Sequence, residues 1–188
     1  MKEMKLNKLY SVYCYDKDDY FTNNKDVNDS CLGIISSHES NNASYDFDKA
    51  REYLENLNYN MYLDNMDTRI YVLKREGEPV SFALYNKIEN TNDWVLELIY
   101  THSEYTTLGL GTVLLRSSAC DLRNNGAENI HTTVAKNNDA SFNLHKSFSK
   151  VEGVKTSVDD VDNRLKFMFN IKEMKTDKTK DEAEEILF

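Results

Sequence analysis

Residues 105–115 read YTTLGLGTVLL, and the two glycines of this stretch, Gly109 and Gly111, separate two apolar runs. The preceding run, residues 94–101, has the composition of a strand, and the following run, residues 110–122, has apolar side chains at helical spacing. A strand, a glycine turn and a helix N-terminus leave backbone N–H groups unpaired, and such groups bind phosphate. Glycine also lets the backbone approach a ligand closely. The stretch therefore predicts a phosphate or pyrophosphate site.

Three kinds of phosphate-binding loop compete for this stretch. A P-loop requires Lys and then Ser or Thr after the second glycine, but Thr112 and Val113 stand there. A dinucleotide fingerprint requires a small residue at the position of Leu114. The pattern fits best the pyrophosphate loop of an acyl-CoA site. A plain glycine turn that caps a buried helix stays open as the alternative.

The bulk composition is that of one folded domain, or one domain with a short appendage. The chain has 188 residues with 40% hydrophobic and 29% charged side chains, and no apolar run approaches the roughly 20 residues that cross a bilayer. The net charge of -9 argues against a nucleic-acid surface and is compatible with a cationic amine substrate. Cys14, Cys31 and Cys120 form no metal or redox motif, which predicts reduced thiols in a cytoplasm.

The periodicity of the remaining chain predicts a mixed α/β order. The expected elements are a strand at 9–15, a loop or weakly structured insert at 16–42 with a short helical piece at 31–35, helices at 47–57 and 59–65, strands at 70–74, 80–87 and 94–101, a helix at 110–122, a strand at 130–134, a helix capped by Asn138, and a strand at 165–171. The strand–loop–helix–strand unit within residues 94–134 should be parallel and right-handed.

Two motifs in this order resemble those of the GNAT superfamily of acyl-CoA-dependent N-acyltransferases. The family's loop pattern is Gln or Arg, two residues, Gly, one residue, then Gly or Ala, and it falls on Thr106, Gly109 and Gly111. A second pattern, Asn followed by a small-residue pair and Leu-Tyr, is matched by Asn138, Ala140-Ser141 and Leu144. The resemblance covers roughly residues 70–171.

The chain departs from the family pattern at three places. Thr106 stands where a long Gln or Arg donor is usual, and His145 stands where the family has Tyr. The usual Gly-Phe pair is Ser149-Lys150. These departures bear on activity more than on fold.

The resemblance implies a mixed, mostly antiparallel sheet of six to seven strands flanked by about four helices. It implies a single acyltransferase domain over residues 1–171, and the mostly charged residues 172–188 would form a tail or short helix. It also implies acetyl-CoA as cosubstrate, with its pyrophosphate on the glycine loop and its pantetheine arm along residues 94–101. The residues expected to contact it are Ile99, Tyr100, Thr101, Thr106, Thr107, Leu108, Gly109, Leu110, Gly111, Thr112 and Asn138.

Acyl transfer to an amine needs a base and benefits from an acid. Glu97 is the candidate base because it lies inside an apolar run, where half burial would raise its pKa, although it could equally face water on an exposed side of the strand. Glu104 is a weaker alternative. His145, in place of the family's Tyr, is the candidate acid that protonates the thiolate. His38, His102 and His131 show no ligand spacing, so no metal is expected.

The leading hypothesis is an N-acetyltransferase that transfers an acetyl group to a primary amine, small or peptidic, by direct attack. A non-catalytic acyl-CoA-binding module is the first alternative. A protein-interaction role for residues 16–42 and the acidic tail is the second. No nucleic-acid or membrane partner is expected, and self-association as a homodimer stays open.

Overall fold

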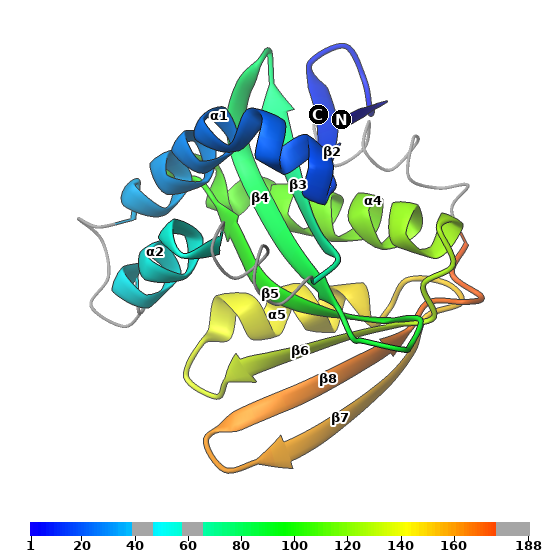
Figure 1. The fold of residues 1–188 in the computed structure, drawn as a ribbon. Coiled ribbons are helices and arrows are strands. Elements are labelled where there is room, and N and C mark those ends of the chain that lie inside the picture. The colour runs from blue at the N-terminus through cyan, green and yellow to red at the C-terminus, as the bar shows by residue number, and fades with distance from the viewer. Residues whose placement is uncertain (39–46, 58–65, 176–188) are drawn as a thin grey trace.

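The computed structural model describes residues 1–38, 47–57 and 66–175, and within them one eight-stranded sheet organises the chain (Figure 1). The strand order is β1-β2-β3-β4-β5-β6-β8-β7. The strands are β1 (Lys2–Lys5), β2 (Tyr10–Tyr15), β3 (Thr68–Arg75), β4 (Glu78–Lys87), β5 (Asp93–Thr101), β6 (Asn129–Ala135), β7 (Lys155–Val161) and β8 (Arg164–Asn170). Every neighbouring pair is antiparallel except β5 and β6, which are parallel. The predicted mixed, mostly antiparallel sheet is confirmed, with eight strands instead of six to seven.

Helices cover both faces of this sheet. They are α1 (Lys17–Ser36), α2 (Phe47–Glu55), α4 (Leu110–Asn124) and α5 (Asp139–Phe148), and a 3-10 helix, η1 (Ser103–Leu108), precedes α4. One apolar core lies between the sheet and α1 with α2, and the other lies between the sheet and α4 with α5 (Figure 1). None of the helices in the described residues combines the length and apolar character of a membrane span.

The expectation of a loop or weakly structured insert at residues 16–42 is wrong, because α1 occupies most of this segment. The Asp16 side chain caps it by accepting the Asp19 N–H at 2.9 Å. Asn23 has non-helical dihedrals (φ -121°, ψ 18°) that kink the helix. Asn, Asp and Ser favour turns locally, so the segment reads as a loop. The five buried α1 side chains hold the helix on the sheet; they are Tyr20, Val27, Cys31, Ile34 and Ile35.

Both edge strands of the sheet escaped sequence prediction. The short β1 carries three charged residues and is exposed, and β7 is exposed along nearly its whole length. Neither shows the alternation of apolar and polar residues that marks a half-buried strand. Pairing with β2 and β8 makes them strands.

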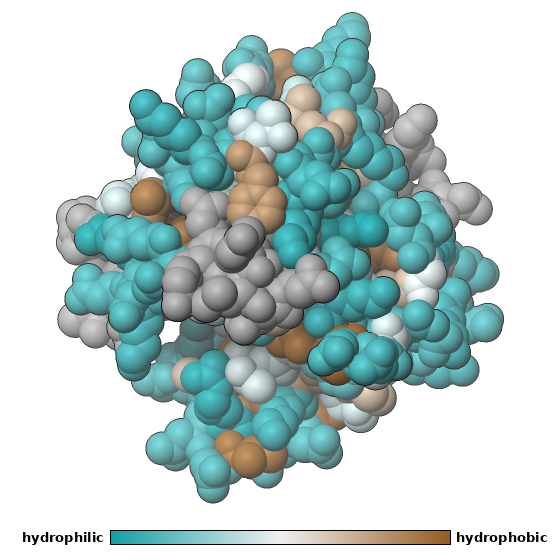
Figure 2. All heavy atoms as spheres, viewed as in Figure 1, coloured by the Kyte–Doolittle hydropathy of each residue, from teal (hydrophilic) through white to brown (hydrophobic). Residues whose placement is uncertain are grey.

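On the face seen in Figure 2 the surface is mostly hydrophilic, with apolar groups in separate patches.

Residues 39–42 of the expected insert lie outside the described residues, and two further expectations fall partly or wholly outside them. The helix expected at residues 59–65 lies there, and so does residue 176 onward of the expected tail. The helices expected at 47–57, at 110–122 and after Asn138 are present as α2, α4 and α5.

A buried carboxylate on α4 contacts two strands of the sheet. Asp121 is 3% exposed and forms ion pairs with Lys2 on β1 and Arg69 on β3. The Tyr71 hydroxyl donates to Asp121 Oδ2 at 2.9 Å. The Arg69 guanidinium also lies over the Trp94 ring, 5.2 Å from its centroid. Asp121 therefore ties α4 to β1 and β3 beneath the sheet.

Asp121→Ala should destabilise the fold by about 2–3 kcal/mol, because it leaves buried donors of Arg69 and Tyr71 without their acceptor. Urea unfolding followed by the fluorescence of Trp94, the one tryptophan of the chain, measures this loss. The matched control is Asp160→Ala, which removes an exposed ion pair with Lys136 and should change the free energy of unfolding by about 0.5 kcal/mol or less. Equal losses in both variants would contradict the assigned role of Asp121.

Candidate active site

The candidate site lies where β5 and β6 separate. These strands pair only between residues 93–95 and 129–131. The Thr132 hydroxyl then donates to the Leu96 carbonyl at 3.1 Å, at the start of the gap. Beyond this point the strands line a cavity of about 830 Å³, a volume within the range of roughly 300–1,000 Å³ typical of small-molecule sites. Because a sheet normally pairs its backbone groups, strands that part expose N–H and C=O groups to a ligand.

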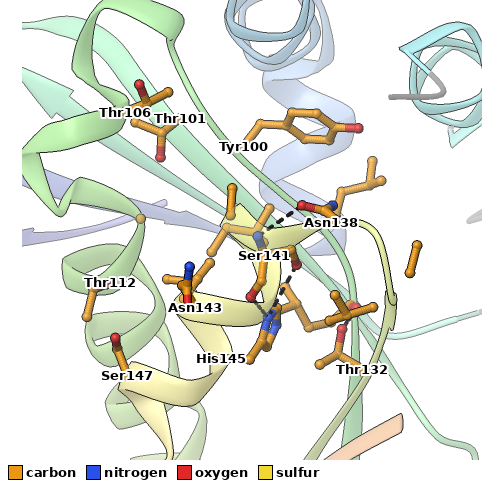
Figure 3. Close-up of a pocket in the computed structure, with 18 of the residues that line it drawn as sticks. Tyr100, Thr101, Thr106, Thr112, Thr132, Asn138, Ser141, Asn143, His145 and Ser147 are labelled. Carbon is orange, nitrogen blue, oxygen red and sulfur yellow. Dashed lines mark hydrogen bonds between the residues drawn. The ribbon is translucent and has the colours of Figure 1, made fainter. Parts of the chain in front are cut away.

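The open edge of β5 presents the backbone of Ile99 and Thr101. The His102 N–H donates to the Val80 carbonyl on β4 at 2.9 Å. In an antiparallel pair the backbone groups of alternate residues face the same neighbour. The backbone of Tyr100 therefore faces β4, while Ile99 and Thr101 face the gap. Tyr100 reaches the cavity with its side chain (Figure 3).

His38, just after α1, fastens the end of α1 to this edge. Its Nε2–H donates to the Thr101 carbonyl at 2.7 Å, and its ring lies edge-on to Tyr100. The adjacent Ser37 hydroxyl oxygen accepts the Ser103 N–H at 3.0 Å. His38 lines the cavity, although its place in the sequence had suggested no role for it, not even as a metal ligand. The contact joins residues 63 positions apart, so no local pattern indicates it.

The two glycines of the loop serve different physical needs. Gly109 has a φ of 71°, in the left-handed region, where it turns the chain from η1 into α4. A Cβ on Gly111 would lie 3.2 Å from the Thr101 hydroxyl oxygen and 3.7 Å from Leu144. Gly111 therefore allows the first turn of α4 to pack closely against β5 and α5.

The first turn of α4 borders the cavity at Gly111 and Thr112. The N–H groups of Thr112 and Val113 both donate to the Gly109 carbonyl, at 3.0 and 3.1 Å. The N–H groups of Leu110 and Gly111 come before the first bonded N–H and have no partner within the helix, as is usual at a helix N-terminus. The Thr112 N–H is engaged within the helix, and Thr112 lines the cavity (Figure 3).

Most of the predicted acetyl-CoA contacts share this cavity. Those that line it are Ile99, Tyr100, Thr101, Thr106, Gly109, Gly111, Thr112 and Asn138. Three others are not among the described lining residues: Leu110 is buried in the core, Leu108 is 42% exposed, and Thr107 is exposed on η1. The Thr106 hydroxyl donates to the Ser103 carbonyl at 3.2 Å, so it serves the turn in place of the family's long donor.

On the opposite wall, α5 holds His145. Asn138 caps this helix by accepting the Ser141 N–H at 3.0 Å, as predicted. His145 is 1% exposed, and its ring stacks on Phe167 and Phe169 of β8. Its Nδ1 lies 2.6 Å from the Ser141 carbonyl, which only accepts, so Nδ1 carries the hydrogen (Figure 3).

The second ring nitrogen of His145 is left for a ligand. Among the described residues, the buried Nε2 has no hydrogen-bond partner. Burial lowers the pKa of the imidazole, although the Ser141 carbonyl raises it in part. His145 is therefore mostly neutral at pH 7, with a lone pair on Nε2.

Glu97 occupies a bulge in β5. Tyr85 pairs with Leu96 and Leu84 with Leu98, which leaves Glu97 as an extra residue opposite no partner. Bulges re-aim side chains and occur next to active sites. Glu97 lines the cavity and stays open to solvent. Removal of part of its hydration by the surrounding protein raises the pKa of its carboxyl, and a hydrogen bond from Asn86 lowers it in part.

Neither Glu104 nor a metal cluster contributes to the cavity as described. Glu104 lies exposed on η1 and is not among the described lining residues. Within residues 1–38, 47–57 and 66–175, no three His, Cys, Asp or Glu side chains gather as metal ligands would.

Comparison with known proteins identifies the family. The model of the Acetyltransferase (GNAT) family matches residues 28–149, more than half of the chain, and the protein belongs to this family. It is thus an acetyltransferase, and the acyl donor of the family is acetyl-CoA. No curated protein sequence matches the chain.

Solved structures share the fold at low sequence identity. The PaiA N-acetyltransferase from Thermoplasma acidophilum in complex with coenzyme A has a TM-score of 0.60 at 14% identity, over 84% of this chain and 99% of that one. The ribosomal-protein-S18-alanine N-acetyltransferase from Escherichia coli has a TM-score of 0.58 at 15% identity, over 90% and 97%. RimL, a ribosomal L7/L12 alpha-N-protein acetyltransferase in complex with coenzyme A, has a TM-score of 0.54 at 10% identity, over 89% and 96%.

Gly111→Val should weaken acetyl-CoA binding about tenfold, because the added methyl groups overpack the contact with Thr101 and Leu144 and push α4 away from the cavity. Isothermal titration calorimetry measures the dissociation constant. The matched control is Gly33→Val on α1, where an added Cβ meets nothing within 4 Å, and its affinity should equal that of the wild type. Equal affinity in both variants would place the cofactor away from the glycine loop.

Proposed function

We propose that this acetyltransferase transfers the acetyl group of acetyl-CoA to a primary amine by direct attack, with Glu97 as base and His145 as acid. One observation carries the proposal: a carboxylate on a strand bulge shares a cavity with an open strand edge and a helix N-terminus. These are the three groups that the reaction needs, namely a proton acceptor, donors for the thioester and a site for the pyrophosphate.

Each part of the cofactor would meet a suitable group in the cavity. The N–H groups of Leu110 and Gly111, at the positive end of the α4 dipole, suit the pyrophosphate. The open edge of β5 suits the amides of pantetheine, which would pair with it as another strand does. An N–H of Ile99 or Thr101 would then polarise the thioester carbonyl and stabilise the oxyanion as the amine attacks.

Glu97 would prepare the attacking amine. An alkyl amine has a pKa near ~10 and arrives protonated, so it must lose a proton before it attacks. The raised pKa of Glu97 makes its carboxylate a stronger base than an ordinary glutamate. The nitrogen then forms its bond to the acetyl carbon, the carbon–sulfur bond breaks, and the sulfur leaves with the bonding electron pair.

His145 would supply a proton to that sulfur from Nε2. In the protonated ring, Nδ1–H keeps its bond to the Ser141 carbonyl while Nε2–H is available to the leaving group. The lowered pKa makes this form scarce at neutral pH but a stronger acid. A thiolate that forms nearby favours the protonated ring by its charge.

The acceptor would be a cationic amine, either a small molecule or a peptide N-terminus. The net charge of -9 attracts such a substrate. The names of two similar structures refer to ribosomal-protein acetyltransferases, which supports a peptide amine as one acceptor class. Cys14, Cys31 and Cys120 are all free thiols, which supports a cytoplasmic location.

Glu97→Gln should lower kcat/KM roughly 100- to 10,000-fold, because the amide cannot take the proton of the amine. The dissociation constant for acetyl-CoA should stay the same. In the wild type, activity should fall as the pH drops through the raised pKa of Glu97, since protonation removes the base. Initial rates on an amine panel from pH 5 to 9 measure both effects, and Glu104→Gln is the control. A pH profile that Glu97→Gln leaves unchanged would remove Glu97 from the mechanism.

His145→Ala should lower kcat roughly 100-fold, since the thiolate then leaves unprotonated. His145→Tyr should retain much of the activity because a phenol restores a donor. Steady-state rates test this, with thermal unfolding to show that both variants are folded. Wild-type rates in both variants would make His145 structural. A wild-type protein that binds acetyl-CoA but acetylates no amine would support the non-catalytic alternative.

A further inference from the structure

A polar cluster is buried beneath the helices on the α1 and α2 side of the sheet. Thr68 on β3 is 0% exposed and Asn86 on β4 is 5% exposed, and they pair across the two strands. Both lie beyond the apolar residues that α1 and α2 cover, such as Leu84. Buried polar side chains are rare without a hydrogen-bonding reason.

Two hydrogen bonds hold the Asn86 amide, one through its oxygen and one through its nitrogen. The Thr68 hydroxyl donates to Asn86 Oδ1 at 2.8 Å, and Asn86 Nδ2 donates to the Tyr53 hydroxyl of α2 at 2.7 Å. Asn86 pairs with Val95, two residues before Glu97 on the neighbouring strand, and from there a hydrogen bond of its side chain lowers the pKa of the Glu97 carboxyl. An ionised carboxylate only accepts, so Nδ2 must face Glu97 and Oδ1 must face Thr68. The orientation of the amide is thus determined by its neighbours.

The bulge in β5 brings Glu97 to this cluster. Leu98 packs in the core beneath α1 and α2, while Leu96 packs in the opposite core. Side chains alternate along a strand, and Leu96 and Leu98 would share one face without the bulge. Glu97 comes next after Leu96 in the chain and therefore points to the other face, which α1 and α2 cover. Its interaction with Asn86 and Tyr53 agrees with that placement.

We propose that Asn86 is a positioning residue that holds the Glu97 carboxylate toward the acceptor amine, and that Thr68 and Tyr53 hold Asn86 in turn. The inference rests on the proposed function of Glu97. Asn86 donates a hydrogen bond to the ionised form of Glu97 and so opposes the effect of desolvation on its pKa. Without Asn86, desolvation would act unopposed, and more of Glu97 would be protonated at neutral pH.

The other titratable groups around Glu97 do not account for the shift of its pKa. Tyr53 on α2 interacts with the Glu97 charge, but burial raises the pKa of Tyr53, so it stays neutral at pH 7. His38 after α1 and Tyr100 on β5 line the same cavity. Among the described groups, desolvation and the Asn86 hydrogen bond are the causes that shift the Glu97 pKa.

Asn86→Ala should shift the acid limb of the kcat/KM profile upward by about one pH unit, because one hydrogen bond to a charged group is lost. The dissociation constant for acetyl-CoA should not change, since Asn86 lies outside the cofactor cavity. The same upward shift should appear in the titration of the Glu97 carboxyl carbon, followed by NMR on protein with labelled glutamate. Glu97→Gln identifies that resonance by its disappearance.

Two further variants keep the test decisive. Asn170→Ala removes a part-buried asparagine that donates to Asn129 on β6, at the paired end of the gap, and it should leave both titrations unchanged. Tyr53→Phe removes only the hydroxyl that anchors Asn86, so it should fold and shift Glu97 in the same direction by a smaller amount.

The two readouts separate this inference from the proposed function. If the wild type acetylates no amine, the proposed function fails, and the NMR titration still tests the link between Asn86 and Glu97. An unchanged Glu97 titration in folded Asn86→Ala and Tyr53→Phe overturns the inference even if the enzyme is active. A lower rate in Asn86→Ala with an unshifted pH profile also overturns it, because loss of fold alone would produce that result.

Discussion

The separation of β5 from β6 is the constraint on which the rest of the site depends. Two parallel strands that pair over only three residues and then part leave backbone groups of Ile99 and Thr101 without a sheet partner. In a folded protein such groups need another partner. The Thr132 hydroxyl donates to the Leu96 carbonyl, just before these residues, and the His38 ring donates to the Thr101 carbonyl. The remaining backbone groups of this edge face the cavity.

Close packing brings the N-terminus of α4 next to the open edge of β5. Because Gly111 has no side chain, α4 begins directly beside Thr101 and Leu144. The N-terminus of the helix and the open strand edge therefore face one cavity. On the other wall, the cap at Asn138 fixes where α5 begins and thereby the position of His145 along the cavity. A ligand that carries phosphates at one end and amides along its arm matches this arrangement.

Desolvation acts in opposite directions on the two candidate catalytic groups. It raises the pKa of the Glu97 carboxyl and lowers the pKa of the His145 imidazole, because in both cases it disfavours the charged form. The neighbours act against it in both cases: Asn86 stabilises the carboxylate, and the Ser141 carbonyl stabilises the imidazolium. A cavity that partly desolvates both side chains, and keeps a hydrogen bond to each, can thus hold a candidate base and a candidate acid.

The sequence by itself determined the glycine turn into α4, the cap of α5, the β3–β5 meander and the parallel unit, because each depends on residues close together in the chain. Local periodicity also placed Glu97 within an apolar strand, although it could not show the bulge. Only the tertiary structure decided that residues 17–36 form a helix, since burial against the sheet outweighs the turn preference of Asn and Ser. It alone paired the edge strands β1 and β7, and it alone joined Asn86 to Glu97 and His38 to Thr101. Such contacts join residues that are distant in the chain, and a hydrogen bond between distant residues leaves no periodic trace in a sequence.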